Sequence, residues 1–527
     1  MKTLKIWGAM ILLVLAGACT EGFEEINLDP NNPTEVPTSY LFTQAERGLQ
    51  EILNTSGLLY AQMWAETQYT NTSRYETENL DFSQYYRGTE PTDGTTGMGG
   101  LYDLQEIIRL NSDEETMEAV SVSGSNANQI AVARILKAWT YHQLTDIWGD
   151  IPYSQALQGR GNFSPQYDMQ SDIYPGLISE LDEAVAQINT AEPGVVGDVI
   201  YGGNMEKWQL FAQSLKLRIG MRMSKVAPDQ AQAAITSALA AGVFTSNDDN
   251  AMFQNLSDAA NDNQYYQHFL TRTDYAISDV MGEFMNNQND PRLPIYASPT
   301  GAALAAFATD ASAELDINGM PYGVSSDVAG SITNATISFP GATVRSATSP
   351  SLMMTYPEVL FIQAEAAAMG WTGGDAQGLY EQAIMASMDF WNAQSAAISY
   401  DAIYSADIGQ AVSGAKEALE AEITDAEVTA YMAQAGVAYN PATAMQQIAE
   451  QKWLALYMQG LQAWSEWRRT GYPELTPAPD AVENREIPRR RGYDQIEFDL
   501  NKTNYDEAVS RLDNGNTMAS RMWWDVQ

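Results

Sequence analysis

The amino-acid sequence predicts a mostly α-helical fold in which tetratricopeptide-like helix pairs form a superhelical scaffold, with an irregular, loop-rich region that carries a few short strands. Three observations support this prediction. Apolar residues recur at helical spacing in several long segments, two of these segments are joined by a short Gly-Trp-Thr-Gly-Gly turn, and residues 247–351 are dense in Gly, Asn, Asp, Pro and Ser.

The segment 128–157 contains the clearest predicted helix, and the other helices are expected to pack around it. Its apolar stripe is wide because two sets of residues repeat at helical spacing, namely Val132, Leu136 and Trp139, and Ala131, Ile135 and Ala138. Gly149 and Pro152 are expected to end the helix, since glycine permits a positive φ and proline cannot donate to a continuing helix. We interpret the turn around Asp150 as structural, with its carboxylate bonded to the backbone.

Helical periodicity appears on both sides of this segment. Thr38 is expected to be the N-cap of the first helix, and Gly460 is expected to bend or split the last. Residues 378–384 have the small and aromatic pattern typical of the second helix of a tetratricopeptide unit. The predicted helices are 37–54, 57–69, 101–110, 172–188, 204–225, 231–241, 355–369, 375–391 and 441–469, and inside the irregular region 247–351 only 278–287 keeps helical periodicity.

Composition and charge exclude some classes of function. The chain of 527 residues is 45% hydrophobic, which is typical of a globular protein. Its 67 acidic residues outnumber 28 basic ones, and the formal net charge is −39. Because binding to nucleic acid requires clustered Lys and Arg to neutralise phosphates, the sequence argues against a nucleic-acid partner.

The first 36 residues predict export and a lipid anchor. Lys2 and Lys5 precede an apolar run of ten residues and then three small residues, the pattern of a signal peptide. Cys19 follows directly and is the only cysteine of the chain. The site resembles a bacterial lipobox, although Leu15 stands one position further from the cysteine than usual. We predict a signal peptide at 1–18, lipidation of Cys19, a tether at 19–36 and a single domain at 37–527; the alternative is an ordinary secretory signal.

Several ordered motifs resemble one protein family along nearly the whole mature chain. They are Cys19 with Phe-Glu-Glu-Ile-Asn at 23–27, Asn-Asn-Pro-Thr at 31–34, Leu-Thr-Asp-Ile-Trp-Gly-Asp-Ile-Pro-Tyr at 144–153, Ile-Tyr-Gly-Gly at 200–203, Asn-Asp-Pro-Arg-Leu-Pro at 289–294, Tyr-Pro-Glu-Val-Leu-Phe-Ile-Gln-Ala-Glu at 356–365, Tyr-Met-Gln-Gly at 457–460 and Trp-Ser-Glu-Trp-Arg-Arg-Thr-Gly at 464–471. In this order the chain resembles the SusD/RagB family of Bacteroidetes outer-membrane lipoproteins, and within it the SusD-like branch.

This resemblance implies a scaffold of four tetratricopeptide-like helix pairs with the irregular region laid over it. It also implies a lipoprotein of the outer membrane that faces the cell exterior, binds a glycan and delivers it to a SusC-like TonB-dependent transporter. Capture of a peptide, as in RagB-type relatives, is the alternative. The chain departs from many members by having Gln451-Lys452 and Gln459-Gly460 in place of Glu-Arg and Glu-Gly. It therefore falls in a subgroup whose ligand need not be shared.

Two irregular stretches are the candidates for glycan binding, namely 69–86, which lies within the irregular segment 69–100, and 261–275. A sugar is recognised by flat aromatic faces together with amides and carboxylates, and both stretches offer these groups. The alternative is that each aromatic ring anchors its loop in the core. The candidate residues are Tyr75, Tyr85 and Tyr86 in the first stretch, and Asn261, Asp262, Tyr265 and Tyr266 in the second.

The other charged motifs are interpreted as structural. The turn at 289–292 is expected to hold a salt bridge, and the basic run 489–491 is expected to neutralise neighbouring carboxylates, with contact to an anion or a partner as the alternative. A calcium site within 247–263 stays open, although the spacing of an EF-hand is missing.

The sequence argues against an enzyme and predicts no cofactor. A surface glycosidase, the rival hypothesis, needs two carboxylates that face each other across a cleft. Glu358 and Glu365 are seven residues apart on one predicted helix, so they lie on the same face about 10 Å from each other. Two carboxylates on one face cannot easily stand on either side of a glycosidic bond. His142 and His268 are the only histidines, and the mature body has no cysteine besides Cys19, which argues against a transition-metal or Cys-His site. We expect His142 to be a core residue.

We predict that Cys19→Ala abolishes lipidation, because the thiol is the group that a lipoprotein anchor modifies. The measurement is incorporation of radiolabelled palmitate into the protein in growing cells. Incorporation that survives the substitution would refute the anchor.

Overall fold

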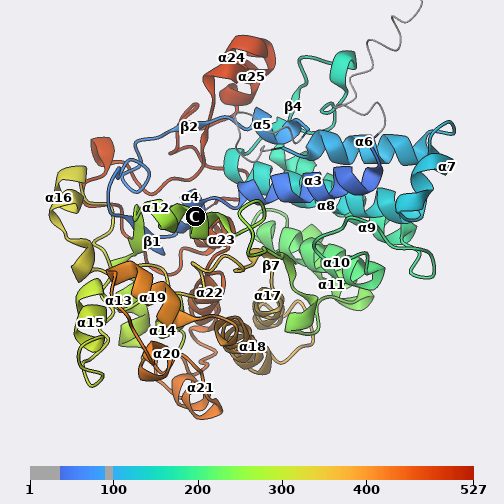
Figure 1. The fold of residues 1–527 in the computed structure, drawn as a ribbon. Coiled ribbons are helices and arrows are strands. Elements are labelled where there is room, and N and C mark those ends of the chain that lie inside the picture. The colour runs from blue at the N-terminus through green and yellow to red at the C-terminus, as the bar shows by residue number, and fades with distance from the viewer. Residues whose placement is uncertain (1–35, 89–98, 527) are drawn as a thin grey trace, which may run out of the picture.

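The computed structural model describes residues 36–88 and 99–526 (Figure 1). The predicted signal peptide, Cys19 and all of the tether except Val36 lie outside the described residues, as does part of the irregular stretch 69–100. The signal peptide and the lipidation site therefore stay predictions.

Long helices form a continuous packed array, which confirms the predicted mostly helical scaffold. α6 packs on α8, α8 on α9, α10 on α11 and α17 on α18, and these neighbours are visible as adjacent ribbons in Figure 1. The helices of the array are α3 (Thr38–Leu49), α6 (Leu101–Ser112), α8 (Asn126–Trp148), α9 (Gln170–Gln187), α10 (Met205–Arg222), α11 (Pro228–Ala241), α17 (Tyr356–Ala368), α18 (Ala376–Ala396), α22 (Ala444–Ala455) and α23 (Gly460–Thr470).

Shorter elements connect and cover this array. The short helices outside the irregular region are α4 (Thr55–Tyr60), α5 (Ser83–Tyr86), α7 (Met117–Val120), α19 (Tyr400–Ile408), α20 (Ala415–Ala418), α21 (Asp425–Met432), α24 (Gln495–Leu500) and α25 (Lys502–Ser510). The 3₁₀ turns are η1 (Gln50–Ile52), η2 (Ser121–Ser123), η3 (Gly159–Gly161), η4 (Asn247–Asp249), η5 (Asn334–Thr336) and η6 (Val482–Asn484).

Eight short strands form four separate pairs. β1 (Trp64–Glu66) is antiparallel to β6 (Tyr275–Ile277), and β3 (Ile151–Pro152) to β4 (Tyr167–Asp168). β5 (Ala251–Phe253) is antiparallel to β7 (Ser351–Met354), whereas β2 (Asn79–Leu80) and β8 (Gly492–Tyr493) are parallel. β5, β6 and the first residue of β7 belong to the irregular region 247–351, and the pairing of β6 with β1 ties that region to the segment after α4.

The central helix α8 is buried from Ala131 onward on nearly every side. It begins two residues before the predicted start, where the Ser125 hydroxyl accepts a hydrogen bond from the Asn128 backbone. It ends where predicted, since Gly149 has a φ of 85° and reverses the chain. The Asp150 carboxylate accepts the backbone N–H of Gln170 at 2.8 Å, which confirms the structural interpretation of this turn.

The irregular region contains more helix than predicted. Besides α13 (Asp279–Asn287), which was expected, it holds α12 (Gln264–Thr271), α14 (Leu293–Tyr296), α15 (Gly301–Phe307) and α16 (Ser326–Ser331). These helices are too short to show a repeating apolar pattern. Side-chain caps at Asn263, Ser278 and Thr300 start three of the helices in this region. The region read as loops with a few strands therefore holds four further short helices that periodicity did not reveal.

Two predictions near the beginning of the described chain are also wrong. The helix expected at 57–69 ends at Tyr60, because Gln62 takes a left-handed conformation (φ 54°) and the chain then enters β1. Thr38 does not cap α3. It lies inside the helix, and its hydroxyl donates to the Gln129 amide oxygen on α8.

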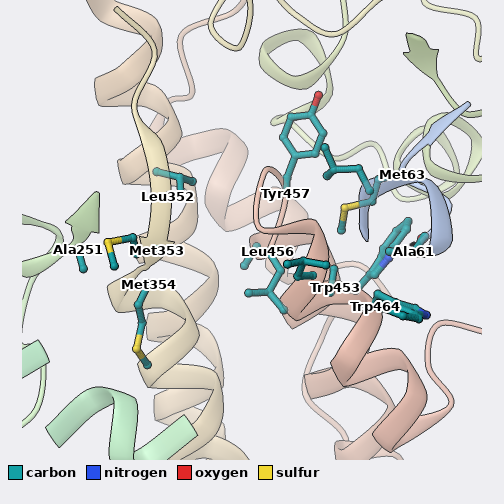
Figure 2. Close-up of a cluster of buried hydrophobic side chains, with 14 of the residues drawn as sticks. Ala61, Met63, Ala251, Leu352, Met353, Met354, Trp453, Leu456, Tyr457 and Trp464 are labelled. Atoms are coloured by element: carbon teal, nitrogen blue, oxygen red, sulfur yellow. Dashed lines mark hydrogen bonds between the residues drawn. The ribbon is translucent and has the colours of Figure 1, made fainter. Parts of the chain in front are cut away.

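A close crossing of α4 and α23 fixes one side of the core. Gly460 splits the predicted helix 441–469 into α22 and α23, as expected, and lies against Gly57 of α4. A methyl group on Gly57 would come within 2.3 Å of the Leu461 backbone nitrogen. Close by, the Trp453 indole donates to the Ala61 carbonyl at 3.0 Å. Figure 2 shows this part of the core, with Trp453, Leu456, Tyr457 and Trp464 on one side and Leu352, Met353 and Met354 of β7 on the other.

A buried network of ion pairs joins five helices. Glu466 of α23 forms ion pairs with Arg222 of α10 at 2.6 Å, with Arg469 at 2.7 Å and with Lys452 of α22 at 2.9 Å. Arg222 also lies 3.2 Å from Asp146 of α8. The network extends to α17 through Arg469 and Glu365 at 2.7 Å, and a separate buried pair joins Arg218 and Glu358 at 2.6 Å.

His142 is a core residue, as predicted. It is fully buried on α8, with Nε2 3.5 Å from an Asp146 carboxylate oxygen and its ring against Tyr174. Burial, assisted by the positive charges of Arg222 and Arg218, outweighs Asp146 and lowers the pKa of His142 to about 3. The imidazole is therefore neutral in the folded protein at neutral and mildly acidic pH.

The two charged motifs interpreted as structural have different outcomes. Asp290 and Arg292 form the predicted salt bridge at 2.6 Å. Of the basic run, Arg489 pairs with the Asp525 carboxylate at 2.9 Å, and within residues 36–88 and 99–526 neither Arg490 nor Arg491 has a carboxylate at salt-bridge distance. Arg490 donates to the Trp148 carbonyl and stacks on Tyr493, and Arg491 donates to the Tyr60 hydroxyl, so the expectation of neutralised carboxylates is wrong for both.

We predict that Gly57→Ala lowers the free energy of unfolding by about 3 kcal/mol, because the new methyl group would overlap backbone atoms of α23 that cannot move independently. Chemical denaturation monitored by circular dichroism measures the change. Gly373→Ala is the matched control, since its methyl group would meet no atom within 4 Å. Equal stability of the two variants would contradict the close crossing.

We predict that His142 makes the protein less stable in acid. Below pH 6.5, the ordinary pKa of histidine, His142 becomes protonated in the unfolded chain but stays neutral in the folded protein. The stability that depends on neutral His142 is therefore present above pH 6.5 and is lost as the pH falls. Between about pH 7 and about pH 5 the wild type should lose about 2 kcal/mol more than His142→Gln. Denaturation curves at both pH values measure the difference, and identical losses would refute the buried neutral imidazole.

Candidate functional site

The aromatic residues of the first predicted stretch point into the protein. Tyr75 is fully buried with a φ of 63°, and its hydroxyl accepts the Ala478 backbone N–H at 3.1 Å. Tyr85 is 2% exposed and packs near Trp148. Tyr86 is half-buried, and its hydroxyl donates to the Pro152 carbonyl at 2.7 Å. In this structure Tyr75 and Tyr85 have no free ring face for a sugar.

Of the four candidates in the second predicted stretch, Tyr265 is buried and the other three are partly exposed. The Tyr265 ring stands edge-on to Trp64 and its hydroxyl donates to the Leu53 carbonyl at 3.2 Å. Asn261 donates to the Asp258 carboxylate at 2.8 Å, and Asp262 accepts the Gln267 amide at 2.5 Å. Tyr266 is half-buried on the first turn of α12.

Asn261 and Asp262 line a hollow of about 440 Å³, a size suited to a small ligand. Its wall is formed by the end of α3, by η1, by the loop after β5 and by the start of α12. Neutral amides dominate it, so we call it the amide hollow. Its lining residues are Thr43, Arg47, Gln50, Glu51, Val199, Phe253, Gln254, Asn255, Leu256, Ala259, Ala260, Asn261, Asp262, Gln264 and Gln267.

Glu51 is where the two predicted stretches approach each other. Its carboxylate lines the amide hollow, and burial raises its pKa. The negative charge of Glu51 in turn helps to raise the pKa of Tyr85, from the first stretch, and of Tyr265, from the second. The two stretches thus come together behind the hollow, although their tyrosines support its wall and do not line it.

An exposed aromatic surface lies beyond the other end of α12. Tyr69 is 63% exposed, and the Arg272 guanidinium lies 5.2 Å from the centre of its ring. Asp274 forms a salt bridge with this arginine at 2.5 Å and also accepts a hydrogen bond from the Gln68 side chain. Asn334 approaches the same edge by donating to the Thr273 hydroxyl at 2.8 Å. We call Gln68, Tyr69, Arg272 and Asn334 the tyrosine shelf.

The sequence alone did not single out Tyr69 or Glu51. Tyr69 opens the first predicted stretch, and its special position depends on the pairing of β1 with β6, which brings residues about two hundred positions apart together. A left-handed tyrosine (φ 54°) directly after a strand has no distinctive sequence pattern. In the sequence, Glu51 is indistinguishable from any acidic residue of an amphipathic helix. Its position is special only because the loop 254–262 lines the same hollow in the folded protein.

Two other hollows are less suited to a neutral ligand. The larger, of about 510 Å³, contains Arg511 and Arg521, but these are already paired with Asp150 at 2.5 Å and Asp525 at 3.2 Å. The smaller, of about 310 Å³, contains Asp290, which is paired with Arg292. Their charged groups mainly bind one another.

The carboxylates considered for glycoside hydrolysis have structural partners. Glu358 and Glu365 are buried and each is held by an arginine, so neither faces a cleft. Among residues 36–88 and 99–526 there is no group of three or more His, Cys, Asp or Glu side chains that could hold a metal ion. Within the same ranges, no helix combines the length and the apolar character needed to span a bilayer.

The structure is that of a helical-repeat protein, and its amide hollow is a polar cavity large enough for a small ligand. A family model described as "SusD-like_2: Starch-binding associating with outer membrane" matches residues 30–494. The chain belongs to this SusD-like family. The resemblance expected from the motifs is therefore confirmed over most of the chain.

Solved structures give the same result. The chain is similar to a chitin-binding protein at 27% identity, with a TM-score of 0.73 and coverage of 93% of this chain and 99% of that one. It is similar to a SusD homologue from Bacteroides uniformis at 25% identity, a TM-score of 0.69 and coverage of 93% and 100%. A chitin-binding SusD homologue from Flavobacterium johnsoniae shares the fold at 23% identity, with a TM-score of 0.69 and coverage of 93% and 99%. No curated protein matches the chain.

Proposed function

We propose that the protein is a lipid-anchored binding protein on the outer face of the outer membrane, which captures a glycan and delivers it to a SusC-like TonB-dependent transporter. Family membership supports the association with the outer membrane and the glycan class of ligand. The chitin-binding relative at 27% identity supports a polysaccharide built from amino-sugar units. The observation that carries the proposal is α12, which has an amide-lined hollow at one end and an exposed tyrosine at the other.

The two ends of α12 offer complementary chemistry. Amide side chains both donate and accept, so the hollow can match the hydroxyl and acetamido groups of a sugar. The Tyr69 ring presents a flat face on which the apolar side of a pyranose packs, and Arg272 stiffens that ring by stacking against it. An oligosaccharide that lies along α12 would contact both. Of the seven residues predicted from the sequence, Asn261, Asp262 and Tyr266 stay candidates for direct contact.

The same geometry supports binding without catalysis. The hollow contains Glu51 and Asp262, but Asp262 is bonded to Gln267, and general acid-base cleavage needs a second carboxylate free to move protons. Delivery to a transporter then requires only release of an intact ligand. We therefore place the protein among binders and not among glycosidases.

We predict that Tyr69→Ala and Gln254→Ala each weaken binding of chitin oligosaccharides about tenfold, because each removes one of the two contact surfaces. Isothermal titration calorimetry on the purified protein measures the affinity. Tyr102→Ala is the control, since Tyr102 is also an exposed tyrosine (44%) but lies on α6. Unchanged affinity in both test variants would remove this site.

The same ligands test the absence of catalysis. Incubation of the protein with the oligosaccharides should release no new reducing ends. Clear turnover would overturn the binding function in favour of a glycosidase, and binding of peptides without binding of any glycan would favour the RagB-type alternative.

A further inference from the structure

Glu51 is a partly buried carboxylate without a partner. It lies in the 3₁₀ turn η1, which continues α3, and it forms no hydrogen bond or ion pair with any residue of 36–88 and 99–526. Removing a carboxylate from water is unfavourable unless a cation or hydrogen-bond donors replace the lost solvent. Strongly buried carboxylates of the scaffold either pair with arginine, as Glu358 and Glu466 do, or accept backbone N–H groups, as Glu46 and Glu66 do.

The charged groups around Glu51 leave its negative charge uncompensated. Arg47 lies one turn earlier in the same hollow, but its guanidinium donates to the Ala260 carbonyl at 2.5 Å and forms no salt bridge. Asp262 adds a second negative charge to the lining of the hollow. Behind the hollow, Tyr85 and Tyr265 are neutral hydroxyl groups whose pKa is raised by burial. The hollow therefore carries two carboxylates against one arginine.

We propose that the amide hollow selects glycans that carry a free ammonium group, and that Glu51 binds this group. The proposal rests on the proposed function and names its ligand more closely, as an amino sugar in place of a neutral sugar. The ammonium group brings three hydrogen-bond donors and a positive charge to Glu51, the carboxylate in the hollow that has no partner. The surrounding amides then bind the hydroxyl groups of the same sugar ring.

A metal ion fits these residues less well. Calcium requires six to eight oxygen ligands, usually with several carboxylates, and the described residues contain no cluster of three acidic or histidine side chains. One unpartnered carboxylate, with the second already bonded to Gln267, offers an organic cation a single charged contact and offers calcium too few ligands. The wall of the hollow contributes one aromatic ring, Phe253, so a cage for a quaternary amine is not formed.

The test compares three β-1,4-linked oligomers of equal length, built from glucosamine, N-acetylglucosamine or glucose. Calorimetry at a mildly acidic pH, where the amine is protonated, should give about tenfold tighter binding for the glucosamine oligomer than for the glucose oligomer. Glu51→Gln should remove this preference and leave the affinity for the two neutral oligomers within about twofold. Because Glu51 has no partner in the fold and its buried charge is unfavourable, the variant should unfold at or slightly above the wild-type temperature.

A control variant separates this site from general attraction. A chain with a net charge of −39 attracts any polycation, and that attraction is weakened equally by the loss of any one acidic residue. Glu118→Gln, which removes an exposed carboxylate on α7, should therefore leave the preference intact. Equal effects of the two substitutions would overturn the role of Glu51.

The possible failures can be told apart. If no oligomer binds, the proposed glycan function fails. If the neutral oligomers bind and the amine brings no advantage, or an advantage that survives Glu51→Gln, the glycan function stands and this inference fails. If lysine-containing peptides bind in a manner dependent on Glu51 and the glucosamine oligomer does not, the ammonium site is real but its ligand is a peptide.

Discussion

The carboxylate of Glu466 is the contact on which the arrangement of the helices most depends. It binds cations from α10, α22 and its own helix, and these cations reach Asp146 of α8 and Glu365 of α17. The charges lower the pKa of Glu466 far below its ordinary range in spite of its burial. A buried network of this kind need not add stability over apolar packing, but any shift of one helix along another would leave a charge unpaired. It therefore fixes the register of the scaffold, and the departure at Gln451-Lys452 keeps a cation for Glu466.

The sequence predicted those parts of the fold that are defined by local pattern. The long helices, the stop at Gly149 and the break at Gly460 follow from periodicity and from glycine and proline, which act over a few residues. The short helices of the irregular region and the strand pairs depend on partners far away in the chain, as in the pairing of Trp64 with Ile277. The basic run at 489–491 was misjudged for the same reason, since carbonyl and hydroxyl acceptors from α8 and α4 cannot be recognised from sequence.

The candidate site was predicted in outline but not in detail. The segment 261–266 does reach a hollow, because a loop dense in Asn and Asp cannot be buried and tends to line the surface. The tyrosines of both stretches turned out to be mostly structural, since a ring that is flat enough to stack on a sugar also fills a core well. The exposed Tyr69 and the unpaired Glu51 are distinguished by their surroundings, and these surroundings come from tertiary structure.

The packing of residues 522–525 has a consequence for the stage of folding at which the core is completed. Trp524 is fully buried, with the guanidinium groups of Arg468 and Arg222 stacked 4.8 and 5.3 Å from its ring. A chain that extends only to α23 lacks part of the aromatic cover of these two arginines, because Trp464 already stacks on Arg468 at 3.7 Å but Trp524 is not yet present. The core around Arg222 and Arg468 is therefore complete only after residues 522–525 have packed against it.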